Sequence, residues 1–468
     1  MKKNLFFLVF LFNFYALSAA VYTVGSDADY PSPNALYLAD VLQDGDTVRI
    51  AAEEYIGTAA LAVWMQNDLL LQGTGGRPHL IADGEYIWGK GIWVLVGDNI
   101  TVENIEFSGA AVPDQNGAGI RLDGVGLTVE NCHFHDNENG ILTNNPQTGN
   151  IHITHTEFGG NGHGDGFSHN LYIGRTDTLT FLYNYTHHAQ IGHLLKSRAK
   201  VNIIEYNRFS DEATGSSSRL IDLSNGGKAV IVGNVFMQGE NAPNNNFIGF
   251  GKEGLTAGIP HELYCGNNTF VNERQGSCLF IDFADGTDAV YLLNNIFTGG
   301  GTLTGGSTET FVESNVIIED TDDLFFVDAE NYDYRLTAES PVIDSGLFVD
   351  LEQEDLLPEK MYVHPVGFTE RVKVNGVVDA GAYEFGEVSG TSDLSGNTMQ
   401  VFPNPTAGIF RIAGLQPSAR VRVFDMQGRE VKAVRNDNSF DISGSASGVY
   451  VVKIFEGEES FFTTKVFK

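Results

Sequence analysis

Short apolar phrases, each closing on an asparagine and then an apolar or aromatic residue, recur along the chain. In order they are NITVENIEF (99–107), LTVENCHF (127–134), NIHITHTEF (150–158), TLTFLYNYT (178–186), VNIIEYNRF (201–209), AVIVGNVF (229–236), ELYCGNNTF (262–270) and AVYLLNNIF (289–297). They end at Phe107, Phe134, Phe158, Thr186, Phe209, Phe236, Phe270 and Phe297. Successive ends lie 27, 24, 28, 23, 27, 34 and 27 residues apart. Such a period predicts a solenoid whose turns bury apolar residues only against the turns above and below.

The repeated elements are short strands. The chain contains 54 Gly, 32 Phe and 17 Tyr in 468 residues, which suits short strands joined by tight turns and argues against a helical array. We therefore predict an all-β fold, a parallel β-helix over residues 21–386. The crossover preference favours a right-handed winding, which the family resemblance given below also implies.

The two ends of the solenoid differ from its repeats. A helix from about Ser32 to Leu42 is predicted to close the first end, where an unpaired strand edge would invite aggregation. The coils run to about Val316. Segments 333–346 and 377–385 are predicted as irregular terminal coils, with the acidic loop 350–359 as a solvated excursion between them.

The first twenty residues have the features of a secretory leader. Lys2 and Lys3 precede an apolar run from Leu5 to Leu17, and Ser18-Ala19-Ala20 offers small residues for cleavage. No later stretch reaches the roughly 18 apolar residues that a spanning helix needs. The formal net charge of −32 disfavours nucleic-acid binding, so an acidic ligand must meet a local basic patch. We expect a monomer.

A linker and a second domain follow the solenoid. Residues 387–397 are rich in Gly and Ser, and 398–468 alternate apolar and polar residues with Pro, Gly and Asn at the turns. This pattern predicts a small antiparallel β-sandwich. One interpretation of such a sandwich is an adhesion or carbohydrate-binding domain.

This last domain resembles the type A sorting domain of the Bacteroidetes type IX secretion system. The resemblance implies recognition by the secretion machinery and passage through the outer membrane, with the cargo released or fixed at the cell surface. It is carried by Pro403-Asn404-Pro405-Thr406 with Gly408, by Val423-Phe424-Asp425 with Gly428, and by Gly448-Val449-Tyr450 with Lys465.

Buried polar and sulfur residues of the repeats are interpreted as structural. The repeated asparagines are expected to form an amide ladder inside the coils. Cys132 and Cys265 fall within repeat phrases as small buried hydrophobes, and a Cys265–Cys278 bridge stays an alternative. The ladder residues are Asn184, Asn207, Asn234, Asn268 and Asn295.

The segment HLLKSRAK (193–200) departs most clearly from the repeat. The chain carries 28 Lys plus Arg in all, yet Lys196, Arg198, Lys200 and Arg208 fall close together, just after three histidines that include His188 and His193. In a strand Lys196, Arg198 and Lys200 would share one face.

Neighbouring coils add to this segment. One coil later, SRLIDLSNGG (218–227) brings Arg219 and Asp222 near Lys196, and one coil earlier HNLYIG (169–174) brings His169 and Tyr172. The sequence therefore predicts an outward wall that carries cations, imidazoles and an aromatic ring.

Such a wall suits β-elimination on a uronic-acid polysaccharide. Cations that neutralise the uronate carboxylate ease removal of the neighbouring proton by a base, and an acid protonates the leaving oxygen. Lys196 serves as base only if Arg198 and a charged His193 lower its pKa. If Asp222 pairs tightly with Lys196, the lysine stays charged, and His193 or Tyr172 must be the base. A structural Lys196–Asp222 ion pair is the simpler alternative.

The segment 194–239 resembles the core of the chondroitinase B and alginate lyase family of parallel β-helix polysaccharide lyases. The resemblance rests on KSRAKVNIIEYNRFSDE followed by LSNGGKAVIVGNVFMQG. It implies that Lys196 is the catalytic base. The family's catalytic arginine position falls on Ser224, so Arg219 or Arg198 would have to substitute. The family's acidic calcium ligands fall on Ala189 and Ile191.

Three functions follow as hypotheses. The favoured one is a secreted polysaccharide lyase acting on an acidic polymer, with Lys196, Arg198, His193, Arg219 and Asp222 as catalytic candidates. Candidate substrate-binding residues are His169, Tyr172, His188 and Lys200. The alternatives are a non-catalytic glycan-binding protein or adhesin and a β-helix glycoside hydrolase.

The residues identify no cofactor with certainty, and calcium stays an alternative. The Gly-rich GHGDG (162–166) offers His163 and Asp165 as metal ligands, but a plain turn is the simpler interpretation.

Overall fold

The computed structural model describes residues 19–347, 356–373, 376–386 and most of the strands between 400 and 467. The chain divides into two compact units, Met1–Glu387 and Val388–Lys468. All but the last two residues of the predicted leader, and the whole predicted linker 387–397, lie outside the described residues. Among the described residues, no helix has the length and apolar character needed to cross a bilayer.

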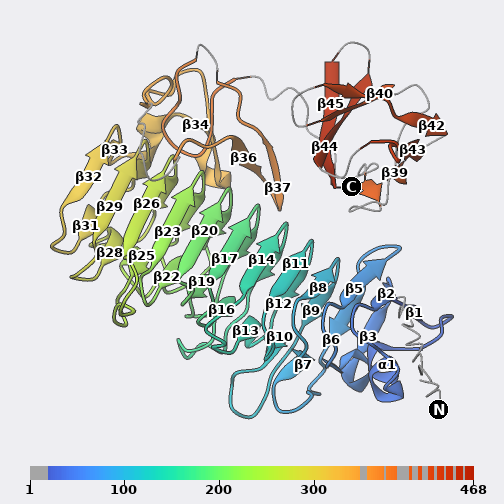
Figure 1. Cartoon of the computed structure of the whole chain (residues 1–468). Helices are drawn as coiled ribbons and strands as arrows, with labels where there is room; N and C mark the ends of the chain where they lie inside the picture. Colours follow the sequence, from blue (N-terminus) through green and yellow to red (C-terminus); the bar gives the residue numbers. More distant parts are fainter. Residues whose placement is uncertain are drawn as a thin grey trace, which may run out of the picture. The chain divides into compact units, whose positions relative to one another are not determined.

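Three parallel sheets wind around one core in the first unit (Figure 1). Sheet A contains β1 (Val21–Val24), β2 (Thr47–Ala51), β5 (Leu70–Thr74), β8 (Ile100–Glu103), β11 (Leu127–Glu130), β14 (Asn150–Thr154), β17 (Thr178–Leu182), β20 (Val201–Glu205), β23 (Lys228–Val232), β26 (Glu262–Gly266), β29 (Ala289–Leu293) and β32 (Thr310–Glu313). Sheet B contains β3 (Glu54–Ile56), β6 (His79–Ile81), β9 (Glu106–Ser108), β12 (His133–His135), β15 (Glu157–Gly159), β18 (Tyr185–His187), β21 (Arg208–Ser210), β24 (Val235–Gln238), β27 (Thr269–Asn272), β30 (Ile296–Thr298) and β33 (Val316–Ile318). Sheet C contains β4 (Ala62–Trp64), β7 (Gly91–Leu95), β10 (Ala118–Leu122), β13 (Asn139–Thr143), β16 (Leu171–Ile173), β19 (Leu195–Ser197), β22 (Ile221–Leu223), β25 (Asn246–Phe250), β28 (Leu279–Phe283) and β31 (Thr302–Gly305). The predicted parallel β-helix is confirmed.

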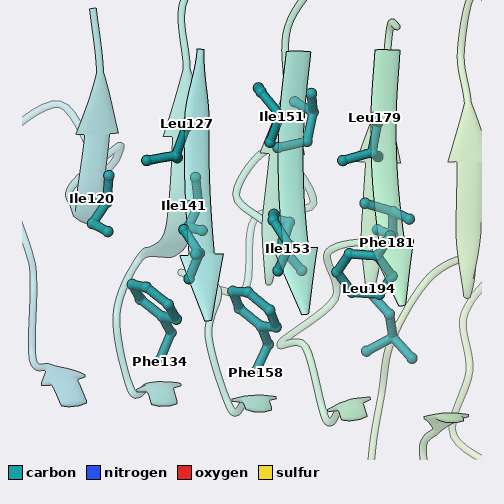
Figure 2. Close-up of a cluster of buried hydrophobic side chains, with 14 of the residues drawn as sticks. Ile120, Leu127, Phe134, Ile141, Ile151, Ile153, Phe158, Leu179, Phe181 and Leu194 are labelled. Carbon is teal, nitrogen blue, oxygen red and sulfur yellow. The ribbon is translucent and has the colours of Figure 1, made fainter. Parts of the chain in front are cut away.

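Like residues stack from coil to coil inside the solenoid (Figure 2). Strand pairing sets Phe107 beside Phe134 and Phe134 beside Phe158. The ring centroids are 4.8 and 5.1 Å apart and the rings are nearly parallel. These coils thus bury their aromatic residues against one another, which is the physical content of the repeat.

Thr186 interrupts this aromatic column. The ring of Phe181, from β17, fills the space and lies 5.9 Å from Phe209 on the next coil. The Thr186 hydroxyl donates to the backbone oxygen of Leu194 at 3.2 Å and accepts from the Asn170 amide at 3.0 Å. Where the other coils have phenylalanine, Thr186 therefore makes polar contacts, one of which fixes the backbone just before β19.

The predicted asparagine ladder is confirmed. Each side-chain amide donates to the Oδ1 of the asparagine one coil further on, from Asn184 to Asn207, Asn234, Asn268 and Asn295, at 2.9–3.1 Å. All five side chains are fully buried. The ladder satisfies backbone groups at the turn between sheets A and B, since the amide of Asn207 also donates to the backbone oxygen of Phe181 at 2.8 Å.

The predicted end helix exists but is shorter. Helix α1 (Pro33–Ala39) begins after Ser32, whose hydroxyl accepts from the Ala35 N–H, and ends at Asp40, whose φ is 51°. Leu36 is fully buried in the main core, next to the 3-10 turn η1 (Gly57–Ala60) and β4. The helix lies at the β1–β3 end of the solenoid (Figure 1), as predicted.

The chain after β33 does not continue the coils. It forms the 3-10 turns η2 (Thr321–Leu324) and η3 (Ala329–Asn331) and two antiparallel pairs. These pairs are β34 (Phe326–Asp328) with β35 (Asp333–Leu336) and β36 (Lys360–Val363) with β37 (Gly367–Glu370). Of the segments predicted as irregular terminal coils, 333–346 contributes only the antiparallel strand β35, and 377–385 contains no helix or strand.

The described residues between 321 and 386, which we call the returning segment, cover outward apolar residues of sheets A and B. Tyr334 and Ala382 pack on Val235 and Met237 of β24, and Leu356 packs on residues of β23 and β26. Removing these outward apolar side chains from water is favourable. The chain therefore packs back over them and does not form another coil. The predicted solvated loop 350–359 is described only from residue 356, and Leu356 there is buried.

Cys132, Cys265 and Cys278 are free and buried. The Cys265–Cys278 bridge considered from the sequence is therefore not formed.

The second unit consists of two antiparallel four-stranded sheets around one small core. Of the residues that carry the sorting-domain resemblance, 403–406, 408, 428 and 448 lie outside the described residues. The first sheet contains β38 (Gln400–Phe402), β39 (Ile409–Ala413), β43 (Ser439–Asp441) and β42 (Val434–Asn436). The second contains β41 (Glu430–Val431), β40 (Arg420–Asp425), β44 (Val449–Glu456) and β45 (Glu459–Phe467).

Replacement of a central ladder residue should weaken the solenoid. Asn207→Ala leaves buried amide and backbone partners unsatisfied, at a cost of about 1–3 kcal/mol for each group. We expect a clear fall in the urea midpoint measured by far-ultraviolet circular dichroism. Asn315→Ala, at the half-buried end of the ladder, is the control and should lower the midpoint less. Equal midpoints for wild type and Asn207→Ala would contradict the structural role of the ladder.

Candidate functional site

Strand register sets the predicted site residues in one column of sheet C. Tyr172 of β16 pairs with Lys196 of β19, and Lys196 pairs with Asp222 of β22. The column continues to Gly249 of β25 and Asp282 of β28. The three segments that the sequence analysis placed side by side are therefore neighbours.

The column faces away from the coil interior. Leu171, Leu195 and Ile221, which precede these residues, belong to the main hydrophobic core. Because successive side chains in a strand alternate, Tyr172, Lys196 and Asp222 project outward. They are nevertheless covered, since the side chain of Lys196 is only 8% exposed and that of Asp222 is 0% exposed.

Lys196 lies between two carboxylates. Its Nζ donates to Oδ2 of Asp222 at 3.1 Å and to Oε1 of Glu253. Burial would raise the pKa of Asp222, but His193, Lys196, Arg219 and a hydrogen bond from Ser224 outweigh it and bring that pKa to about 2. Asp222 is therefore ionised at neutral pH and pairs with Lys196.

Arg198 binds the same Glu253 carboxylate as Lys196. Its Nη2 donates to Oε2 of Glu253, so a single carboxylate bridges Lys196 and Arg198. Burial acts to raise the pKa of Glu253, but the hydrogen bonds from Lys196 and Arg198 are stronger, and the pKa lies below its usual range. The side chain of Glu253 is 42% exposed and is the most accessible member of the group.

Arg198 also contacts Tyr172 directly. Its Nε donates to the phenol oxygen at 2.7 Å, and its Nη1 donates to Asn225 Oδ1 at 2.6 Å. The guanidinium thus places a positive charge directly beside the phenol oxygen of Tyr172.

Arg219 lies on the other side of Asp222. Its Nη1 donates to Asp222 Oδ1 at 2.8 Å and its Nε donates to Asn246 Oδ1 at 2.8 Å. A Cβ at Gly249 would come within 3.0 Å of both Asp222 and Arg219. The absence of a side chain at Gly249 is what leaves room for Arg219 above the sheet.

His169 and His193 stack beside the column, with ring centroids 4.8 Å apart. Nδ1 of His169 accepts from the His193 N–H at 3.0 Å, and Nδ1 of His193 accepts from the Arg219 N–H at 3.1 Å. Burial lowers the pKa of His193 to about 4 and the pKa of His169 well below its usual range. Both rings are neutral near pH 7 with the proton on Nε2, so both can donate a hydrogen bond but cannot act as the base through Nδ1.

Two predicted binding residues lie elsewhere. β19 ends at Ser197, and Lys200 precedes β20 of sheet A, where its Nζ donates to Asp177 at 2.7 Å. The prediction that Lys196 and Lys200 lie on one face of a strand is thus wrong, because the chain turns between them. His188 follows β18 of sheet B, and its Nδ1 lies 2.7 Å from Nδ1 of His187.

Sequence reasoning missed Glu253. This residue belongs to the connection between β25 and β26 and lies 57 positions after Lys196. Its coil is the longest of the series, with 34 residues between Phe236 and Phe270, and that excess was the available signal for an inserted loop. The spacing does not tell which side chain of the loop reaches the wall.

The positions where the resembled lyase family carries calcium ligands hold no oxygen donors in their side chains. Ala189 is buried and Ile191 is 42% exposed, so these residues do not fit that ion. In GHGDG the carboxylate of Asp165 accepts from the N–H groups of Phe167 and Ser168, which is the geometry of a turn.

Comparison with known proteins agrees with this architecture. Residues 82–238 match the family described as right handed beta helix region, and residues 400–468 match the secretion system C-terminal sorting domain. No curated protein matches the sequence. Among solved structures, the crystal structure of pectate lyase Pel9A is similar at 14% identity, with a TM-score of 0.48, over 79% of this chain and 97% of that chain.

Neither family match singles out chondroitinase B or alginate lyase. The chain carries a right-handed parallel β-helix followed by a type IX secretion sorting domain, and the protein is secreted or attached to the cell surface.

Proposed function

We propose that the outward face of sheet C over β16, β19 and β22 binds a uronate residue of an acidic polysaccharide and cleaves the adjoining glycosidic bond by β-elimination. The observation that carries this proposal is the carboxylate of Glu253, which bridges Lys196 and Arg198. Two cations on adjacent positions of the wall hold one carboxylate, and a uronate offers the same group. The uronate carboxylate takes the position of Glu253 when that loop moves aside.

Neutralising the carboxylate favours the first step. The proton at C5 of the uronate becomes more acidic when Lys196 and Arg198 stabilise the negative charge that develops on the carboxylate. A base takes this proton, the C–H electrons form the C4–C5 double bond, and the C4–O bond breaks. The leaving oxygen takes up a proton and becomes the hydroxyl of the released sugar.

Tyr172 is the group that we propose for the proton transfers. Lys196 is engaged in ion pairs with Asp222 and Glu253, and Nδ1 of His193 already accepts a backbone N–H. The Tyr172 oxygen accepts a hydrogen bond from Arg198 Nε at 2.7 Å, so it lies beside the two cations that would hold the uronate carboxylate. The Tyr172 phenolate accepts the C5 proton, and the resulting phenol returns a proton to the leaving oxygen. Asp222 positions Lys196 and Arg219.

An exposed aromatic residue close in sequence to His169 is a further candidate for sugar binding. Phe167 is 86% exposed and lies two positions before His169, on the loop that leads into β16. A large apolar side chain left in water is informative where it stands next to a polar site. This ring offers a flat surface for the apolar face of a pyranose.

A non-catalytic glycan-binding protein is the second candidate. Ser224, which stands where the resembled lyases carry an arginine, donates to Asp222 at 2.6 Å, so the sequence departs from those enzymes at a reacting position. This wall can then hold a uronate without reacting. The hydrolase alternative has less support, because Asp222 is 0% exposed and hydrolysis needs two carboxylates that reach the substrate.

Removal of Lys196 should abolish cleavage. The purified protein is assayed on alginate, pectate, glucuronan and chondroitin, and the unsaturated product is followed by its ultraviolet absorbance. We expect Lys196→Ala and Tyr172→Phe to lower kcat by roughly 10²–10⁴-fold. Lys200→Ala removes an equal charge outside the cluster and should retain activity. Binding without product on any polymer would establish the glycan-binding alternative, and full activity of Lys196→Ala would contradict the mechanism.

Removal of Glu253 should strengthen binding of a uronate oligomer. Glu253→Ala frees Lys196 and Arg198 from the internal carboxylate, and a partly exposed pair of this kind corresponds to a gain of up to about fivefold in affinity. Isothermal titration calorimetry with a uronate tetrasaccharide measures this gain. Glu240→Ala, an exposed residue of the same coil, controls for net charge and should leave the affinity unchanged. A weaker affinity of Glu253→Ala would contradict the proposed competition.

A further inference from the structure

Sheet B carries a second group of chemically reactive side chains, on coils that precede the sheet C wall. Its members are His79 of β6, Glu106 of β9, and His133 and His135 of β12. Strand pairing sets His79 beside Glu106 and Glu106 beside His133. Leu80, Phe107 and Phe134, which alternate with these residues, belong to the core, so the histidines and the glutamate project outward. We call these four residues the sheet B patch.

The patch converges on one carboxylate oxygen. Oε1 of Glu106 lies 3.0 Å from Nε2 of His135 and 3.6 Å from Nε2 of His79. The three potential ligand atoms all lie within 4.8 Å of one another. Among the described residues, no other three His, Cys, Asp or Glu side chains bring their potential ligand atoms this close together.

We infer that His79, Glu106 and His135 bind one zinc-class divalent ion. Tetrahedral zinc with bonds of about 2.0–2.1 Å separates its ligand atoms by roughly 3.3–3.4 Å, and the two measured distances to Oε1 bracket that value. Imidazole and carboxylate together suit zinc and its neighbours in the first transition row, whereas calcium and magnesium prefer oxygen ligands alone.

A carboxylate behind His135 strengthens the assignment. Nδ1 of His135 lies 2.7 Å from Oδ2 of Asp136, while Nε2 of the same ring faces Glu106. When Nδ1 carries the proton and donates to Asp136, the lone pair of Nε2 faces Glu106 and can bind a cation placed between the two. A carboxylate–histidine–metal arrangement has this form.

The ring of His79 is suited to the same role. Its side chain and those of Glu106 and His135 are 23–25% exposed, so the ion can enter from solvent. Three protein ligands leave a fourth position for water or for a sugar oxygen. The ion would also tie three successive coils together.

Zinc titration of the full secreted chain tests this inference. We expect wild type to bind about one Zn²⁺ per chain by isothermal titration calorimetry, and Zn²⁺ to raise the thermal unfolding temperature. His79→Gln and His135→Gln should weaken binding by roughly 100-fold or more, and Asp136→Asn by roughly 10–100-fold. His152→Gln, an exposed histidine of β14, is the matched control and should bind like wild type.

The spectrum of the Co²⁺ form checks the coordination. Wild type should give the intense visible bands of a four-coordinate ion, and His79→Gln should lose them while keeping its circular dichroism spectrum. Failure of wild type to bind Zn²⁺, or equal binding by the His79→Gln and His135→Gln variants, would overturn the assignment. Ca²⁺ and Mg²⁺ in the same titration should not compete, and competition by either would also overturn it.

Discussion

The in-register stacking of successive coils is the constraint on which the rest of the structure depends. Parallel pairing forces every residue to share a column with its counterparts on neighbouring coils, so a column must hold mutually compatible side chains. Inside, like stacks on like, as with Phe134 and Phe158 or with Asn207 and Asn234. Outside, the same rule brings unlike charges together, and Lys196 meets Asp222 because their strands pair. The structural ladder and the proposed site are two results of one register.

The sheet C wall departs from what stability alone would favour. Burying Lys196 and Asp222 removes both charges from water, and that desolvation can exceed the attraction between them. Apolar neighbours would fill such a column at least as well, as they do on the outward face of β23 and β24 beneath the returning segment. A buried charge group that reaches a partly exposed carboxylate at Glu253 is therefore more readily explained by ligand binding.

Sequence reasoning succeeded where the repeat itself carried the information. The spacing of Phe107, Phe134 and Phe158 fixes the coils, and from the coils follow the ladder and the neighbourhood of Tyr172, Lys196 and Asp222. It failed where the chain leaves the repeat. The loop that carries Glu253 and the segment that returns over sheets A and B have no period, and tertiary contacts decide their course. The prediction that Lys200 shares a face with Lys196 was wrong for a local reason, because the chain turns after Ser197, where β19 ends.

The central claim is that Lys196 and Arg198 form a carboxylate site that Glu253 fills in the absence of substrate. A crystal structure of the Tyr172→Phe variant with a bound uronate oligosaccharide tests it most directly. The account predicts a uronate carboxylate between Lys196 Nζ and the Arg198 guanidinium, with the Glu253 side chain displaced toward solvent. An oligosaccharide bound elsewhere, with the bridge from Glu253 to both cations intact, would contradict it.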